Sequence, residues 1–162
     1  MKILVTGVGF IGNYVVENLL AKGHQVTAFD RHAQLRNDVE TFLGDIRDAT
    51  AVSEAVSHHD GVIHLAGILG TSETWSHVKE AIRSNVFGAI NVFESCAKFG
   101  SDIITLDTGS HWYSPYTISK TCAADLALGY ASRHNIKTGI LRIFNLYGPR
   151  PNNKIIKIIP RF

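Results

Sequence analysis

The stretch Lys2-Ile3-Leu4-Val5-Thr6-Gly7-Val8-Gly9-Phe10-Ile11-Gly12 joins an apolar run to a glycine-rich turn and then to a helical pattern. Its glycines have the spacing G-x-G-x-x-G, directly after a predicted strand. Such glycines allow a tight turn, let a pyrophosphate approach bare backbone, and bring helix and strand close together. Free N–H groups at a helix start also favour phosphate. We therefore predict a dinucleotide site formed by Gly7, Gly9, Phe10, Ile11 and Gly12; an ordinary glycine turn is the alternative.

Asp30 strengthens this prediction because it ends the second predicted strand, 18 residues beyond Gly12. A carboxylate there can bind a ribose 2′-hydroxyl and repel a 2′-phosphate, which favours NAD as the cofactor. Arg31 and His32 follow at once, and in principle they could attract that phosphate instead. Asp45, after the third predicted strand, is expected at the adenine edge; a turn carboxylate or a helix cap near Asp48 is the alternative.

Period-two and period-3.6 patterns alternate along the chain, which predicts an α/β protein with a doubly wound parallel sheet, the Rossmann fold. Continuous apolar runs such as Ile3-Leu4-Val5, Val62-Ile63 and Ile103-Ile104 suit strands buried on both faces. Six strands are expected, at 2–6, 25–30, 41–43, 61–65, 103–106 and 138–143.

Helical spacing lies between these runs. One helix is predicted after Gly12 and ends near Gly23, and another is capped by Asp48. The longest helical stretch is expected over 74–97. A turn-rich segment from 148 to 153 predicts a domain edge, with a dinucleotide-binding domain over residues 1–150 and the start of a further lobe over 151–162.

The composition excludes several classes of protein. The chain has 162 residues, 45% of them hydrophobic, which is enough for one domain with its own core. A net charge of +2 without basic blocks argues against nucleic acid as a partner. The longest uncharged stretch, Ile3 to Val16, is too short and too glycine-rich to span a membrane. With only Cys96 and Cys122, we expect free thiols and a cytoplasmic location. The histidine spacing predicts no metal site.

Tyr116 and Lys120 are the expected chemical centre. They open the predicted helix after the fifth strand, and their i, i+4 spacing places phenol and ammonium on one helical face. A nearby cation favours the phenolate, so Tyr116 is a candidate general base. A surface pair is the alternative, but the position at a strand's carboxyl end, across from the dinucleotide turn, favours the catalytic interpretation.

An ordered series of motifs resembles the extended short-chain dehydrogenase/reductases, and within them the NAD-dependent epimerase/dehydratases that act on nucleotide sugars. The motifs are Thr6–Gly12, Asp30, Gly44–Asp48, His64–Gly67, Ser84–Val86, Ser114–Lys120 and Leu141–Arg150. The resemblance implies a Tyr116 base, Lys120 on the nicotinamide ribose, and Asp45 with Ile46 beside adenine. It also implies Leu65, Ala66 and Gly67 along the cofactor cleft, and Asn145 near the sugar.

Three departures from the family pattern stand out. The glycine turn is one residue shorter than usual. Gly109 occupies or adjoins the slot of a catalytic hydroxyl, which leaves Thr108 and Ser110 as candidates, or as mere turn caps. Members of the family continue into a substrate lobe, whereas this chain stops at Phe162. The apolar stripe in 154–162 would then lack its cover, so we expect a homodimer or other association there.

The expected function is reversible oxidation of a nucleotide sugar, with NAD as cofactor and a transient keto-sugar that is epimerised, dehydrated or reduced. Two alternatives remain. One is an NAD(P)H-dependent carbonyl reductase with the same Tyr116–Lys120 pair. The other is a non-enzymatic cofactor-binding module.

Overall fold

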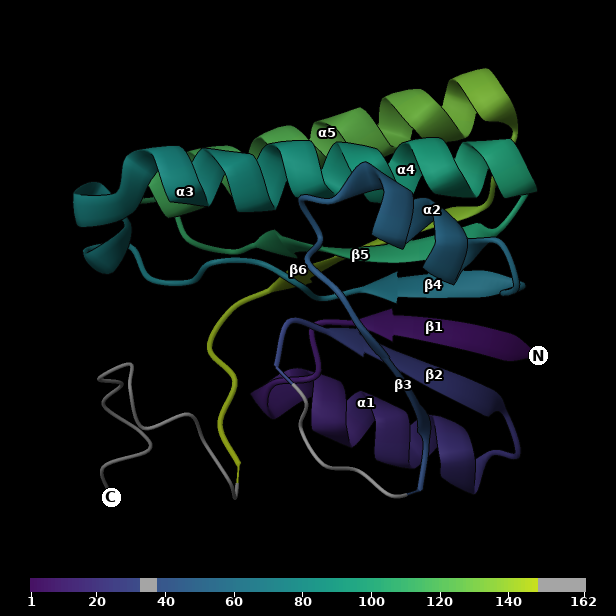
Figure 1. Cartoon of the computed structure of the whole chain (residues 1–162). Helices are drawn as coiled ribbons and strands as arrows, with labels where there is room; N and C mark the ends of the chain where they lie inside the picture. Colours follow the sequence, from purple (N-terminus) through teal and green to yellow (C-terminus); the bar gives the residue numbers. More distant parts are fainter. Residues whose placement is uncertain (33–37, 149–162) are drawn as a thin grey trace.

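The computed structural model describes residues 1–32 and 38–148, and its centre is a six-stranded parallel sheet (Figure 1). The spatial order of the strands is β3-β2-β1-β4-β5-β6. Their bounds are β1 Lys2–Thr6, β2 Gln25–Asp30, β3 Glu40–Leu43, β4 Gly61–His64, β5 Asp102–Thr108 and β6 Thr138–Ile143. All six predicted strands are confirmed, with shifts only at the ends, and the order is that of the Rossmann fold.

Helices cover the sheet on both sides (Figure 1). On one face α1 (Phe10–Ala21) packs against β1 and β2. On the other face lie α2 (Ala49–Val56), α4 (Gly88–Phe99) and α5 (Pro115–His134). The chain leaves β1 toward one face and β4 toward the other, so the carboxyl ends of these neighbouring strands border an opening. Ligands bind at this switch point in doubly wound sheets.

Local capping explains where two of these helices begin. The Asp48 carboxylate accepts hydrogen bonds from the N–H groups of Thr50 and Ala51, at 2.9 and 3.1 Å, so the predicted cap of α2 is confirmed. Ser114 caps α5 by accepting from the Thr117 N–H at 3.1 Å, and Pro115 occupies the first helical position. This cap fixes the start of the helix that carries Tyr116 and Lys120.

The predicted helix over 74–97 is present, but it is not a single α-helix. It starts as a 3₁₀ turn, η1 (Glu73–His77), and continues as α3 (Val78–Ile82). A π-helical segment, η2 (Arg83–Phe87), then leads into α4. Hydrophobic spacing did not reveal the π segment, because it is a single turn inside a stretch whose apolar positions are helical in spacing. The segment turns Asn85 into the interior, where it is 2% exposed.

Two apolar clusters form the core, one on each face of the sheet. The larger cluster includes Leu4, Phe29 and Phe93 under α2, α4 and α5, and the smaller joins Val5 and Val16 under α1. The expectation that Ile103-Ile104 is buried on both faces was wrong for Ile104, which is 38% exposed. Side chains alternate along a strand, and α1 covers β1 and β2 but not β5.

Some sequence expectations fall on residues outside the described ranges. The proposed domain edge lies mostly there, and the apolar stripe in 154–162 lies there entirely. Within residues 1–32 and 38–148, no helix has the length and apolarity needed to cross a membrane.

Candidate functional site at the carboxyl ends of the strands

The glycine turn leaves one side of its backbone open. Gly7 has φ = +82°, and a Cβ there would lie 2.5 Å from the Ala66 nitrogen. A Cβ at Gly12 would collide with the Gly7 carbonyl oxygen, whereas a Cβ at Gly9 would meet nothing within 4 Å. Two glycines therefore permit close backbone packing, and the third leaves free space. This division matches the one predicted for a dinucleotide turn.

Asp30 is fixed against this turn by backbone donors. Its Oδ2 accepts a hydrogen bond from the Val8 N–H at 2.8 Å, and its Oδ1 accepts one from the His32 N–H at 3.0 Å. The carboxylate is held beside the glycine turn at the end of β2, and each oxygen keeps a further acceptor site. Asp30 is therefore oriented to accept hydrogen bonds from the hydroxyl groups of a ligand in the adjoining cavity.

A cavity of about 400 Å³ extends from the glycine turn to the start of α5. Its wall contains every residue predicted to bind cofactor except Asp45: Gly7, Gly9, Phe10, Ile11, Gly12, Asp30, Arg31, Ile46, Leu65, Ala66, Gly67, Tyr116 and Lys120. Among the described residues, Thr108, Ser110 and Asn145 also lie outside this wall, although Phe144 and Leu146 belong to it. The fold thus gathers the five separated segments that contain these predicted cofactor residues around one space.

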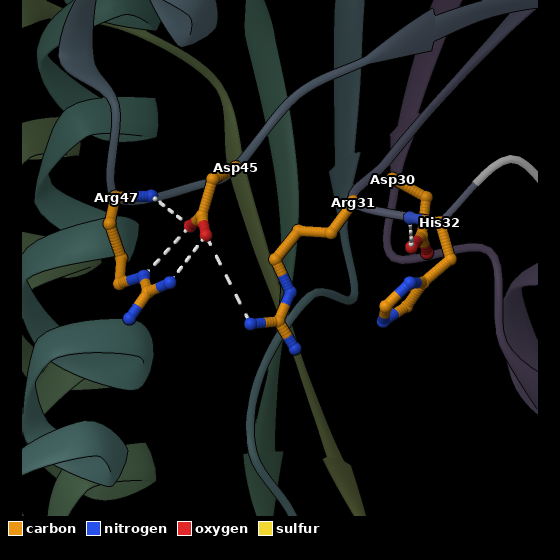
Figure 2. A network of polar contacts seen from close by, with 5 residues as sticks. All are labelled: Asp30, Arg31, His32, Asp45 and Arg47. Atoms are coloured by element: carbon orange, nitrogen blue, oxygen red, sulfur yellow. Dashed lines mark hydrogen bonds and ion pairs between the residues drawn. The ribbon is translucent and has the colours of Figure 1, made fainter.

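Asp45 is paired with arginines in this structure (Figure 2). Arg47 donates from Nε to Oδ1 at 2.9 Å and from Nη2 to Oδ2 at 2.6 Å, and its N–H also donates to Oδ1 at 2.9 Å. Arg31 Nη1 lies 4.0 Å from Oδ2. The hydrogen bond from Arg47 is the main reason that the pKa of Asp45 is lowered. This geometry matches the turn carboxylate kept as an alternative, and an adenine contact for Asp45 stays a prediction.

Tyr116 and Lys120 lie in the first two turns of α5. The Tyr116 N–H donates to Thr74 Oγ1 at 3.2 Å, which ties this helix to η1. Lys120 is 6% exposed, and burial lowers its pKa to about 8, while the negative charge of Asp107 opposes that fall. Burial also raises the pKa of the Tyr116 phenol, so the net shift is opposite to the one expected from a nearby cation.

Of the two candidate hydroxyls, Thr108 and Ser110, only that of Thr108 is hydrogen-bonded to the Tyr116 side chain. A hydrogen bond between the Thr108 and Tyr116 side chains lowers the pKa of the phenol and opposes the effect of burial. The Ser110 hydroxyl instead accepts from the Trp112 N–H at 3.4 Å, and the Ser110 N–H donates to Thr108 Oγ1 at 3.1 Å. Gly109 has no room for a side chain, because a Cβ would collide with the Phe144 ring. These contacts favour Thr108 over Ser110.

Asp107 is a site residue that the sequence reasoning missed. It lines the cavity yet is only 3% exposed, and its Oδ2 accepts from Arg142 Nε at 2.8 Å. Its Oδ1 accepts from the Thr108 N–H at 2.7 Å. The available signal was an acidic residue directly after the predicted strand at 103–106, at the carboxyl end of β5. Its charge raises the pKa of both Tyr116 and Lys120.

Asn85 was noted only as part of a motif, but the structure gives it a definite position. Its Oδ1 accepts from the Ile68 N–H at 2.7 Å, and its Nδ2 donates to Ile68 O and to Ser119 Oγ, both at 3.0 Å. Ser119 in turn donates to the Tyr116 carbonyl at 2.9 Å. Asn85 therefore connects the segment after β4 with the first turn of α5.

Comparison with known proteins agrees with this architecture. Residues 3–162 match the NAD dependent epimerase/dehydratase family over nearly the whole chain.

The chain belongs to this family.

One family relative is UDP-N-acetyl-alpha-D-glucosaminuronate decarboxylase from Bacillus cytotoxicus, 32% identical over 99% of this chain and 60% of the relative. L-arabinose 1-dehydrogenase (NAD(P)(+)) from Haloferax volcanii is 29% identical over 97% of this chain and 65% of its own. The solved UDP-glucose 4-epimerase of Thermus thermophilus in complex with NAD has a TM-score of 0.86 and 28% identity, covering 94% of this chain and 58% of the epimerase. The chain thus spans less than two thirds of these relatives.

Proposed function

We propose that the chain binds NAD in the 400 Å³ cavity and that Tyr116, with Lys120 and Thr108, catalyses the reversible oxidation of a nucleotide sugar by this cofactor. One observation carries the proposal: the glycine turn, Asp30 and the Tyr116–Lys120 pair line the same cavity although they come from distant parts of the sequence. A dinucleotide bound along this wall would extend from a phosphate-binding turn to a candidate general base.

The residues present fit the cofactor. The open space at Gly9 is a place where a pyrophosphate can approach the backbone, and α1 begins at the next residue. The Asp30 carboxylate, fixed by two N–H groups, can accept hydrogen bonds from ribose hydroxyls. At the other end, the Lys120 ammonium can donate to the hydroxyls of the second ribose, as the family resemblance implies.

In the proposed mechanism Tyr116 removes a proton from a sugar hydroxyl. Bound NAD would supply the hydride acceptor and, in its oxidised form, a positive charge. Thr108 holds the phenol by a hydrogen bond and favours its deprotonation. Asp107 helps to keep Lys120 protonated. A protonated Lys120 would favour the phenolate of Tyr116 electrostatically. The resulting keto-sugar is then epimerised, dehydrated or reduced.

The substrate class rests on relatives. The names of the decarboxylase and the epimerase specify UDP-sugars, which supports a nucleotide sugar here as well. The free thiols of Cys96 and Cys122 are consistent with the proposed cytoplasmic location. The expected homodimer rested on 154–162, outside the described residues, and it remains a proposal.

Calorimetry with NAD, followed by turnover assays on a panel of UDP-sugars, tests the proposal. We expect NAD to bind and Tyr116→Phe to reduce turnover at least about 100-fold, because the phenol is the general base. Failure of well-folded protein to bind NAD or NADH would overturn the cofactor assignment. Unchanged turnover in Tyr116→Phe would overturn the catalytic one.

A dehydrogenase or reductase of a small molecule is the second candidate, favoured by the similarity to L-arabinose 1-dehydrogenase. Such an enzyme exchanges its cofactor at every turnover, whereas an epimerase-type enzyme can retain it. Denaturing freshly purified protein and analysing the released nucleotide by mass spectrometry separates the two. Released NAD in near-stoichiometric amount supports the epimerase type.

A further inference from the structure

Four charged side chains lie near the end of β2 (Figure 2), those of Asp30, Arg31, Asp45 and Arg47, and the first two line the cavity. Arg31 follows Asp30 directly, and the Asp45 carboxylate lies between the guanidinium groups of Arg31 and Arg47. The two carboxylates balance the two guanidinium groups in formal charge. Asp30 is the residue expected at the ribose 2′ position, so the charges of the other three side chains act on whatever group that ribose carries.

The two arginines hold Asp45 unequally. Arg47 contacts both carboxylate oxygens within 2.9 Å, whereas Arg31 makes one contact with Asp45 at 4.0 Å. A bidentate, charge-assisted pair is stronger than a single long contact between half-exposed groups. The Arg31 side chain is also 52% exposed. Arg31 is therefore the more easily displaced partner.

Of the three paired residues Arg31, Asp45 and Arg47, only Arg31 faces the cavity. Arg31 belongs to the cavity wall, while neither Asp45 nor Arg47 is among the described residues that line it. Arg31 is thus the arginine of this group that a ligand in the cavity can reach. A planar guanidinium suits a phosphate, because it can donate two parallel hydrogen bonds.

We propose that Asp45 competes with the 2′-phosphate of NADP for Arg31, and so sets how strongly the cavity discriminates between NAD and NADP. This inference rests on the proposed function, since it requires a dinucleotide with its adenosine ribose at Asp30. Asp30 disfavours the 2′-phosphate, and Arg31 offsets that repulsion when Asp45 releases it. The chain then binds NADP more weakly than NAD but measurably.

The test measures Kd for NAD and for NADP by calorimetry, and its readout is the ratio of the two constants. Arg31→Ala should weaken the binding of NADP relative to that of NAD by about tenfold, because the 2′-phosphate loses the guanidinium that would bind it. Asp45→Asn keeps a side-chain oxygen for the Arg47 N–H but removes the charge. Asp45→Asn should strengthen the binding of NADP relative to that of NAD by about threefold, which corresponds to the free energy of an exposed ion pair.

The double variant Arg31→Ala/Asp45→Asn decides whether Asp45 acts through Arg31. In the Arg31→Ala background, Asp45→Asn should leave the ratio unchanged. Arg133→Ala is the matched control, since it removes one arginine charge from the exposed last turn of α5. It should leave the ratio at the wild-type value, and circular dichroism verifies the fold of each variant.

Three results would overturn the inference. An NADP-to-NAD ratio that does not respond to Arg31→Ala removes Arg31 from the site. An equal effect of Asp45→Asn with and without Arg31 makes Asp45 a general electrostatic influence rather than a competitor. Binding of neither nucleotide by folded wild-type protein would reject the proposed function together with this inference, whereas NAD binding with an unresponsive ratio rejects the inference alone.

Discussion

The Asn85 side chain donates a hydrogen bond to Ser119 Oγ at 3.0 Å, and this contact joins a π-helical segment to the helix that carries Tyr116 and Lys120. Asn85 also satisfies both backbone polar groups of Ile68. The Asn85 side chain, which makes these three hydrogen bonds, is only 2% exposed. One buried amide thus fixes the cavity wall after β4 relative to the start of α5.

Asn85→Ala should lower the free energy of unfolding by about 2–4 kcal/mol, because it leaves buried polar groups of Ile68 without partners. Asn91→Ala is the matched control in α4, where the amide makes one described bond, to Ile46 O at 3.0 Å. That variant should lose only about 1 kcal/mol. Urea denaturation measures both. An equal loss in the two variants would contradict the connecting role of Asn85.

Gly9→Ala and Gly7→Ala should separate binding from folding. Gly9→Ala meets no atom within 4 Å, so we expect nearly wild-type thermal stability but at least about tenfold weaker NAD binding, since the methyl group occupies the proposed pyrophosphate position. Gly7→Ala combines a positive φ with a 2.5 Å approach to Ala66, so it should be strongly destabilised. Thermal melting and calorimetry measure the two effects. Full NAD affinity in Gly9→Ala would count against the phosphate-binding role of the turn.

Thr108→Ala should reduce turnover by about 10- to 100-fold, because the Tyr116 phenol loses a hydrogen bond that favours its ionised form. The pH–rate profile should also move to higher pH, because the pKa of Tyr116 rises without that bond. Ser110→Ala is the comparison, and it should change turnover by less than about threefold since its hydroxyl bonds to Trp112. The opposite ranking of the two variants would assign the role to Ser110.

Lys120 should make stability depend on pH in a specific window. Its pKa is depressed from 10.5 to about 8 in the folded chain, so the unfolded chain binds more protons between these values. Stability therefore rises with pH from about 8 to 10.5, and the gain is of the order of 3 kcal/mol. Lys120→Met should lack this rise, which urea denaturation at several pH values would detect.

Asp107→Asn tests whether the charge of Asp107 contributes to the pKa of Lys120. The charge of Asp107 raises the pKa of Lys120, so its removal should move the lower edge of the window below pH 8. An NMR titration of the Lys120 side chain reports that shift directly. If the Lys120 pKa rose or stayed unchanged in Asp107→Asn, the electrostatic coupling between these residues would be rejected.

Much of the fold was predictable because its signals are local. Six β-branched runs and the Asp48 cap each act within a few residues, and these predictions were confirmed. The π segment at 83–87 and the exposure of Ile104 were missed. Both depend on how helices fit across the sheet, which the hydrophobic period of one segment does not record.

The sequence by itself determined the order of strands and helices, the turn at Gly7–Gly12, and the pairing of Tyr116 with Lys120 on one helical face. These follow from spacing along the chain. Only the tertiary structure decided that Asp107 supports Lys120, that Thr108 rather than Ser110 contacts Tyr116, and that Asp45 pairs with Arg31 and Arg47. The physical reason is that charge and hydrogen-bond effects depend on distance and burial in space, which arise only when separated segments pack together.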